Sequence, residues 1–328
     1  MNAHLKNYVL TTFFILLMVV SSGEEIFCVN KPSGCGQIAP DASGFIVNEP
    51  FAILSCLHRI PGRLPTMFTE PTLDLTGVNY NNDGFFSIQK HQQSEAEPEN
   101  LKDDHGAIIR FSTKTKTIYL VFTADAYFEG GDQIFYVMER KGIKGSFFFT
   151  GNFLRERSNY QFIRKIKKAG HYIGVHSDQH LLYCDWDNRD SLLITKNEYE
   201  TDIGNNFKEL KRFGVLPQQA PFFIPPYEWY NKTVVNWGNE LGLKTISFTP
   251  GTGTNADYTV PGMFNYKSSV KIYSGLLKFE RDSEDGLNGA ILLIHPGTSP
   301  ERKDKFYRYL EDLIRHFSSK GYQFKSLK

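Results

Sequence analysis

Apolar and polar positions are patterned differently in the two parts of this chain. From Gly106 onward, short apolar runs typical of buried strands alternate with stretches whose apolar residues recur every three or four positions, as in helices. Before that point the chain is rich in Pro, Gly, Asn and Asp and shows little helical periodicity. We therefore predict a small irregular or β-rich region over 24–105, in which 89–104 is a polar linker or exposed loop, and a regular α/β domain over 106–328.

Within the regular domain, five helix-like segments each end in a glycine, and a short strand-like run usually follows. Glycine is a typical helix stop because it tolerates a positive φ. These repeated units predict a distorted (β/α) barrel of about seven parallel strands, with an open doubly wound sheet as the alternative. The first two strands, 107–111 and 117–123, are predicted to form a hairpin. The stop glycines are Gly142, Gly170, Gly214, Gly242 and Gly321, and the later strands are predicted at 146–150, 171–175, 221–224, 245–248, 290–295 and 322–324.

The first 23 residues have the pattern of a secretory signal peptide. Lys6 precedes an apolar run from Tyr8 to Val20, and Ser21-Ser22-Gly23 supplies the small residues that signal peptidase prefers. The run is short for a membrane span, although an uncleaved N-terminal anchor is the competing interpretation. We expect an exported mature protein with no stable membrane span, at the cell surface, in the periplasm or outside the cell.

Composition narrows the class of protein. The 37 Lys+Arg and 36 Asp+Glu leave a net charge of +1, which argues against a nucleic-acid partner because such binders need a basic surplus. The hydrophobic fraction of 41% excludes a disordered chain. The four cysteines are too few for a disulfide scaffold and form no CxxC pair. Aromatics are abundant, with 27 Phe, 17 Tyr and 3 Trp, and they suit either a core or a sugar-binding cleft.

Polar residues follow the predicted strands, where functional groups gather in barrels and doubly wound sheets alike. Asp125, His176 and His295 each lie at the end of an apolar run, and Tyr227-Glu228 and Asp257 follow two others. The spacing of His176 and His180 allows both imidazoles to meet one cation. The pattern is not the metalloprotease HExxH, because Ser177 stands where Glu is needed.

Four segments together resemble one family, the polysaccharide deacetylases (carbohydrate esterase family 4, with a NodB-like domain). Residues 169–180, AGHYIGVHSDQH, resemble its motif AGHEIGNHSxxH, and 145–151, GSFFFTG, resemble its ATFFVTG strand. Residues 223–228, FIPPYE, resemble FRPPYG, and 291–295, ILLIH, resemble its last motif, an apolar strand ending in His. The matches occur in the family's order and cover roughly 106–328.

The resemblance implies a divalent metal held by two His and one Asp, an Asp base and a His acid. On this sequence His176, His180 and Asp125 are the implied ligands, with Zn expected first and Co, Ni or Fe as alternatives. Asp125 also matches the position of the base, and His295 that of the acid. The candidate substrate-binding residues are Pro226, Tyr227, Trp229, Trp186 and Asp257.

The chain departs from the family in its first and third motifs. The first motif, TFDD in the family, has only Asp125, because Ala126 stands at the second carboxylate. One alignment of this motif makes Asp125 the base, and the alternative alignment makes it the metal ligand. Glu129 and Asp132 are the nearby carboxylates that could reach the site. In the third motif Ile224 replaces the Arg that orients the base. The fourth motif is matched only faintly, around Asp257.

We therefore predict a metal-dependent hydrolase that removes acetyl groups from an N-acetylated, or alternatively O-acetylated, polysaccharide or oligosaccharide. The alternative is a degraded relative that binds glycans without hydrolysing them, motivated by Ala126 and Ile224. A Ser-His-Asp esterase is disfavoured because the chain has no GxSxG elbow.

Overall fold

The computed structural model describes residues 20–21, 24–25, 101–103 and 105–328. Two compact units divide at Pro71, and the first is described only where β1 (Val20–Ser21) pairs antiparallel with β2 (Glu24–Glu25). Most of the predicted signal peptide, Cys28, Cys35, Cys56 and the greater part of the predicted N-terminal region lie outside the described residues. The end of the predicted linker is a strand instead, β3 (Leu101–Lys102).

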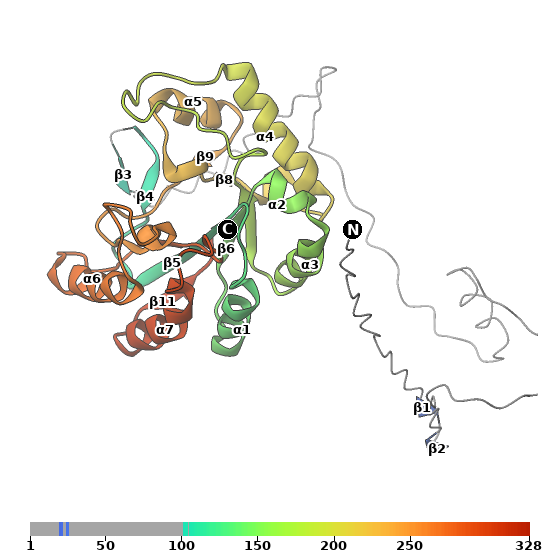
Figure 1. The fold of residues 1–328 in the computed structure, drawn as a ribbon, viewed down its shortest axis with the longest axis vertical. Helices are drawn as coiled ribbons and strands as arrows, with labels where there is room; N and C mark the ends of the chain where they lie inside the picture. Colours follow the sequence, from blue (N-terminus) through green and yellow to red (C-terminus); the bar gives the residue numbers. More distant parts are fainter. Residues whose placement is uncertain (1–19, 22–23, 26–100, 104) are drawn as a thin grey trace, which may run out of the picture. The chain divides into compact units, whose positions relative to one another are not determined.

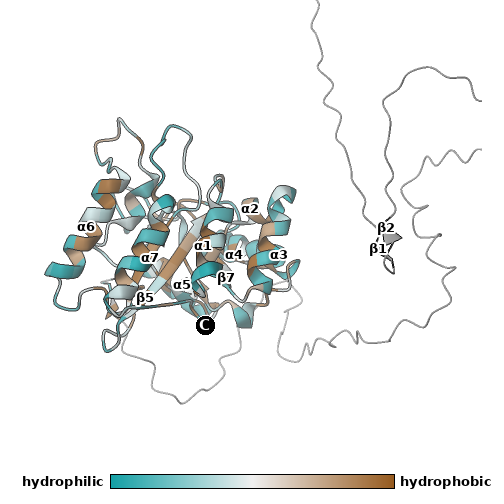
Figure 2. Cartoon of the chain, turned by 90° about the horizontal axis from the view of Figure 1, so that it is seen from below, coloured by the Kyte–Doolittle hydropathy of each residue, from teal (hydrophilic) through white to brown (hydrophobic). Residues whose placement is uncertain are grey.

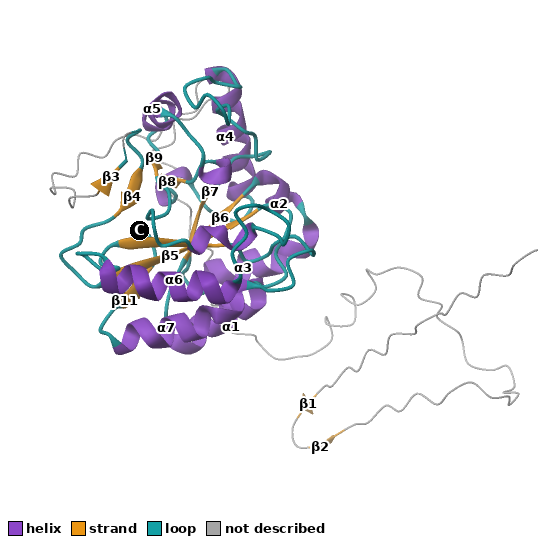
Figure 3. Ribbon diagram, turned by 60° about the vertical axis from the view of Figure 1, so that its left-hand side comes forward, coloured by secondary structure: helices purple, strands orange, loops and turns teal. Residues whose placement is uncertain are grey.

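One large sheet forms the centre of the second unit (Figures 1 and 3). Its strand order is β3-β4-β10-β5-β6-β7-β8-β9, and β11 pairs with the first half of β5. Pairing is parallel from β10 through β9, as the helix–Gly–strand units predict. The strands are β4 (Ile108–Arg110), β5 (Thr117–Ala124), β6 (Ser146–Phe149), β7 (Tyr172–Val175), β8 (Phe222–Phe223), β9 (Lys244–Thr245), β10 (Ala290–Ile294) and β11 (Gln323–Lys325).

The sheet closes nearly on itself. Ile246, just after β9, forms a bridge to Ile108 on β4, and the Ser247 N–H donates to the Ile108 carbonyl at 2.9 Å. The ring then runs through β4, β10, β5, β6, β7, β8 and β9, which confirms the predicted barrel-like α/β fold of about seven strands. The open doubly wound alternative is not observed.

The predicted hairpin between 107–111 and 117–123 is wrong, because β10 lies between β4 and β5. The fully buried β10 pairs along its whole length with β5, from Ala290–Ile118 to Ile294–Phe122. The short β4 meets β10 antiparallel at Arg110–Ala290. Burial of two long apolar strands against each other therefore outweighs the short connection that favoured the hairpin.

Helices cover the outside of the sheet, and α1 and α7 lie side by side there (Figures 1 and 3). All five predicted stop glycines have positive φ, from 65° at Gly142 to 88° at Gly321, so the predicted helix ends are confirmed. No helix in the described part of the chain is both long and apolar enough to cross a membrane. The helices are α1 (Gly131–Lys141), α2 (Gly151–Arg155), α3 (Tyr160–Lys168), α4 (Lys196–Lys211), α5 (Lys232–Glu240), α6 (Ser269–Asp282) and α7 (Leu310–Ser319).

Alternation along the strands divides the buried side chains between two clusters. On β6, Phe147 and Phe149 belong to the large cluster that includes helix residues, whereas Phe148 joins a smaller cluster with Ile246 and Ile291. This follows from the two-residue period of a strand. Figure 2 shows the apolar β5 between helices that turn polar surfaces outward. The three Phe side chains are fully buried, as predicted for core residues.

His171, at the start of the second motif, generates a prediction about stability. Burial, and next the charge of Lys144, lower its pKa from 6.5 to about 4, while its Nδ1 accepts the Gly145 N–H at 3.1 Å. Between pH 6.5 and 4 the unfolded chain therefore binds a proton that the folded chain does not, so stability falls as pH falls. His171→Asn, whose side-chain oxygen can accept the same N–H, should lose about 2 kcal/mol less stability than wild type between pH 8 and pH 5.

Urea unfolding at pH 8 and at pH 5 measures this difference. The pH 8 values provide the baseline, because His171 is neutral there in both states. Equal losses of stability in wild type and variant between the two pH values would contradict the assignment.

Candidate active site

A cavity of about 840 Å³ lies at the carboxyl ends of the parallel strands. The sequence predicts functional residues there, and the structure brings most of them to its walls. Pro226 and Asp257 are the exceptions, since both are buried behind the lining. Predicted residues that line the cavity are Asp125, His176, His180, Trp186, Tyr227, Trp229 and His295, and Asp103, Arg189, Glu228 and Tyr258 line it with them.

His176 and His180 are held as a pair. Their ring centroids lie 5.1 Å apart at 66°, a separation at which both imidazoles can reach one ion. His176 Nδ1 lies 2.8 Å from the carbonyl oxygen of Ile224, and donation there leaves Nε2 available as a ligand atom. Burial, and next the charge of His180, lower the pKa of His176, which favours the neutral form that binds metals. Ile224, where the family has Arg, thus orients a ligand through its backbone.

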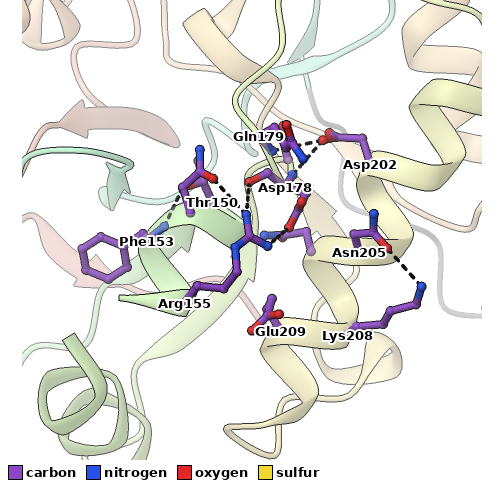
Figure 4. Close-up of polar contacts among 12 residues, drawn as sticks. Thr150, Phe153, Arg155, Asp178, Gln179, Asp202, Asn205, Lys208 and Glu209 are labelled. Carbon is purple, nitrogen blue, oxygen red and sulfur yellow. Dashed lines mark hydrogen bonds and ion pairs between the residues drawn. The ribbon is translucent and has the colours of Figure 1, made fainter. Parts of the chain in front are cut away.

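Asp202 on α4 shapes the loop that carries this pair. Its Oδ1 accepts the N–H groups of Asp178 and Gln179, both at 3.1 Å, and its Oδ2 accepts the Tyr183 hydroxyl at 2.6 Å. Figure 4 shows this contact beside the ion pair of Arg155 with Asp178. These three hydrogen bonds to one buried carboxylate hold the loop in place. Sequence analysis missed Asp202, because nothing in its helical context distinguishes it from a solvated residue.

Asp125, the predicted third metal ligand, is less closely placed than the imidazole pair. Asp125 follows β5 and accepts hydrogen bonds from Thr150 Oγ1 at 2.8 Å and Asn152 Nδ2 at 3.4 Å. Burial lowers the pKa of His180, and the nearby charge of Asp125 opposes that effect. In the part of the chain that the structure describes, however, no group of three His, Cys, Asp or Glu side chains converges tightly enough for an ion. The two imidazoles suit a transition metal, but the Asp125 carboxylate does not lie close enough to them to complete a three-ligand site.

The two acidic residues considered as additional carboxylates are engaged elsewhere. Glu129 pairs with the buried Lys305 at 2.7 Å, and Asp132 on α1 pairs with Lys165 at 2.5 Å. Neither lines the cavity. The expectation that one of them reaches the site is therefore not met in this structure.

His295 and Asp257 form a second pair across the cavity. Asp257 lies in a 3-10 turn, Thr254–Tyr258, and is 1% exposed. Its Oδ1 lies 2.6 Å from His295 Nδ1, and its Oδ2 accepts the His295 N–H at 2.9 Å. Burial alone would lower the pKa of His295, but the charge and hydrogen bond of Asp257 raise it overall. Asp257 is therefore placed to position His295 and is not part of the cavity lining.

An aromatic wall borders the imidazole pair. Trp186, which is 53% exposed, lies 5.5 Å from Tyr227 and 5.4 Å from Trp229 between ring centroids. The Trp229 indole N–H donates to the Asp185 carbonyl at 3.1 Å, and the Arg189 guanidinium lies 4.3 Å over the Trp229 ring. These contacts hold the aromatic wall in place and leave it partly exposed. Tyr183 and Tyr230, in the same two segments, are buried, and Tyr230 contributes to the cavity lining.

The fold is a barrel-like α/β sheet with imidazole and carboxylate side chains at its strand ends, where barrel enzymes carry their active sites. Residues 111–246 match the family model described as polysaccharide deacetylase. The resemblance to this family found in the motifs is therefore confirmed over these residues.

Individual relatives support this family. Peptidoglycan-N-acetylmuramic acid deacetylase PdaA of Bacillus subtilis is 25% identical over 249 residues, which is 74% of this chain and 83% of PdaA. A CE4 family pseudoenzyme from Bacillus anthracis matches with TM-score 0.53 at 18% identity, covering 69% of this chain and 68% of that one. The chitin deacetylase of Colletotrichum lindemuthianum matches with TM-score 0.51 at 18% identity, covering 68% and 89%. The two structural matches show the fold.

The anchoring of the imidazole loop can be tested through Asp202. Asp202→Ala leaves two backbone N–H groups and the Tyr183 hydroxyl without their acceptor. We expect a loss of about 3 kcal/mol in the free energy of unfolding, measured by chemical denaturation. Asn205→Ala, on the same helix but bonded only to Lys208 through its side chain, should change stability by less than about 0.5 kcal/mol. Equal losses in the two variants would contradict a special role for Asp202.

Proposed function

We propose that this domain hydrolyses acetyl groups on an acetylated glycan. The observation that supports this best is the convergence of two different pairs on one cavity. His176 and His180 have the donor atoms and the spacing for a metal ion, and His295 with Asp257 has the arrangement of a proton donor. Acetamide hydrolysis requires both an activated carbonyl and protonation of the leaving amine.

In this proposal the metal is a divalent transition ion, with Zn first and Co, Ni or Fe as alternatives. His176, His180 and Asp125 would hold it, with a small movement of the carboxylate toward the imidazoles. When bound, such an ion supplies Lewis acidity at the acetyl carbonyl and to water. The chain's own contribution is to hold both imidazoles neutral and oriented, through burial and through the Ile224 carbonyl.

His295 acts as the general acid of the proposed reaction. The Asp257 carboxylate accepts from Nδ1 and so leaves Nε2–H facing the cavity for the leaving amine. Although burial lowers the pKa of this imidazole, the charge and hydrogen bond of Asp257 raise it overall, which favours the protonated form. The arrangement thus provides a proton donor without any further conformational change.

The substrate is proposed to be a polymer or oligomer of acetylated sugars. Trp186, Tyr227 and Trp229 offer partly exposed ring faces and edges against which pyranose rings can pack. The relative PdaA is named for peptidoglycan N-acetylmuramic acid, which makes an N-acetyl group the first substrate to try. The apolar run Tyr8–Val20 supports export, which would bring the domain to such glycans outside the cytoplasm.

A second candidate is a glycan-binding protein that no longer hydrolyses. Ala126 removes one carboxylate of the first motif, and Ile224 removes the motif's Arg. This candidate predicts the same aromatic contacts with sugar but no turnover.

Acetate release distinguishes the two candidates. The full chain, loaded with Zn²⁺ or Co²⁺, is incubated with acetylated chitin oligomers and with peptidoglycan fragments, and free acetate is measured. We expect release that is abolished by a chelator and falls at least about 100-fold in His176→Ala. Binding of the oligomers without acetate above the His176→Ala background would favour the binding protein instead.

The proposed acid generates a prediction about pH. A general acid must be protonated, so activity declines on the alkaline side once the pH exceeds the pKa of His295. Because the charge of Asp257 raises that pKa, Asp257→Asn should move the alkaline limb of kcat to lower pH and reduce kcat about 10- to 100-fold. The pH profile of acetate release measures both effects. An unshifted limb would exclude His295 as the titrating acid.

A further inference from the structure

The proposed site is short of one carboxylate. A metal with two imidazole ligands needs Asp125 to complete its set, and hydrolysis needs a second carboxylate to accept a proton from water. Ala126 cannot supply it, and the ion pairs of Glu129 and Asp132 hold those residues away from the cavity. The remaining question is whether another strand end provides one.

Glu228 lines the same cavity from the turn that follows β8. It ends the 3-10 turn Pro226–Glu228 and is half-buried. Tyr227 and Glu228 have φ of 60° and 53°, two consecutive residues other than glycine in the left-handed region. Such a conformation costs on the order of 1 kcal/mol per residue and is typical of functional sites. The strained turn directs a carboxylate into the cavity at the position where the family motif has glycine.

Glu228 also differs from the other buried or half-buried carboxylates at the cavity. Tyr230 donates to Asp103, Thr150 donates to Asp125, and His295 bonds to Asp257. Within the described ranges, the Glu228 carboxylate makes no hydrogen bond or ion pair. Its carboxylate is therefore free to meet a ligand or a water in the cavity.

The electrostatic surroundings of Glu228 suit a group that exchanges protons. Burial raises the pKa of Glu228 to about 7, while the charge of His295 lowers it and that of Asp257 raises it. These are the charged groups that face it, from the segment after β10 and from the 3-10 turn Thr254–Tyr258. No set of three ligand side chains converges in the described part of the chain, so Glu228 is not a third metal ligand in this geometry.

We propose that Glu228 is the catalytic carboxylate that accepts the proton of the attacking water. The proposal rests on the deacetylase function proposed above. Water oxygen bonds to the acetyl carbon while one water proton passes to Glu228, and the C–N bond then breaks as His295 gives its proton to the nitrogen. The products are acetate and the sugar amine. The proton on Glu228 returns to His295 or to solvent, so each group regains its starting state.

Two variants and their combination test this role. Glu228→Gln keeps the shape and removes the proton acceptor, so kcat for acetate release should fall about 100-fold or more with KM within about threefold. Ala126→Asp restores the missing carboxylate just after β5, which frees one of the two neighbouring acids to accept the proton. The kcat of the double variant should therefore be at least about tenfold higher than that of Glu228→Gln. Ala126→Asp alone should raise the wild-type kcat by less than about tenfold.

The control is Glu301→Gln, which removes a carboxylate from an exposed position at the cavity mouth and should keep kcat within about threefold of wild type. Circular dichroism and oligomer binding check that each variant is folded.

The outcomes separate the two proposals. A loss of kcat in Glu228→Gln that Ala126→Asp rescues supports the role of Glu228. Wild-type kcat in Glu228→Gln, a change confined to KM, or a loss without rescue overturns it and leaves the deacetylase function standing if wild type releases acetate. Absence of acetate from wild type overturns the proposed function, and the role of Glu228 with it.

Discussion

One threonine joins three segments where the sheet closes. The Thr249 hydroxyl donates to the Ile109 carbonyl at 2.6 Å and accepts the Ile291 N–H at 2.9 Å, while the Thr249 N–H donates to the Ile291 carbonyl at 3.0 Å. This buried side chain therefore ties the segment after β9 to β4 and β10 together. Because of that connection, the turn with Asp257 lies against the end of β10, and the Asp257–His295 pair can form.

Strain in the described backbone is concentrated at the site. The four residues other than glycine with positive φ there are Ser177, His180, Tyr227 and Glu228. The first two belong to the imidazole loop and the last two to the turn that faces it, and the His180 and Tyr227 rings meet at 4.5 Å. The Asp202 carboxylate secures one loop, and the aromatic wall supports the other. The surrounding barrel thus holds both loops in conformations that neither would adopt alone.

The sequence predicts local features of this fold well and long-range ones poorly. The stop glycines, the apolar strands and the chemistry of His176, His180 and His295 follow from short patterns, because each depends on neighbours along the chain. The insertion of β10 between β4 and β5 depends on pairing residues about 170 positions apart, and no local pattern indicates it. The same holds for Asp202 and Asp257, whose roles are set by partners from other elements. Glu228 was noted as a polar residue after a strand, but only the folded cavity shows that it lacks a partner.

The two departures in the first and third motifs lie in different surroundings. Ile224 is fully buried in the smaller core cluster with Ile246 and Ile291, where an Arg would need a carboxylate partner. An apolar residue at such a position removes the need for that partner. Ala126 is exposed at the cavity, so a carboxylate there would lie in the site and not in the core. The two changes therefore affect different parts of this end of the barrel, and Glu228 is the acidic group that the strained turn adds to the cavity.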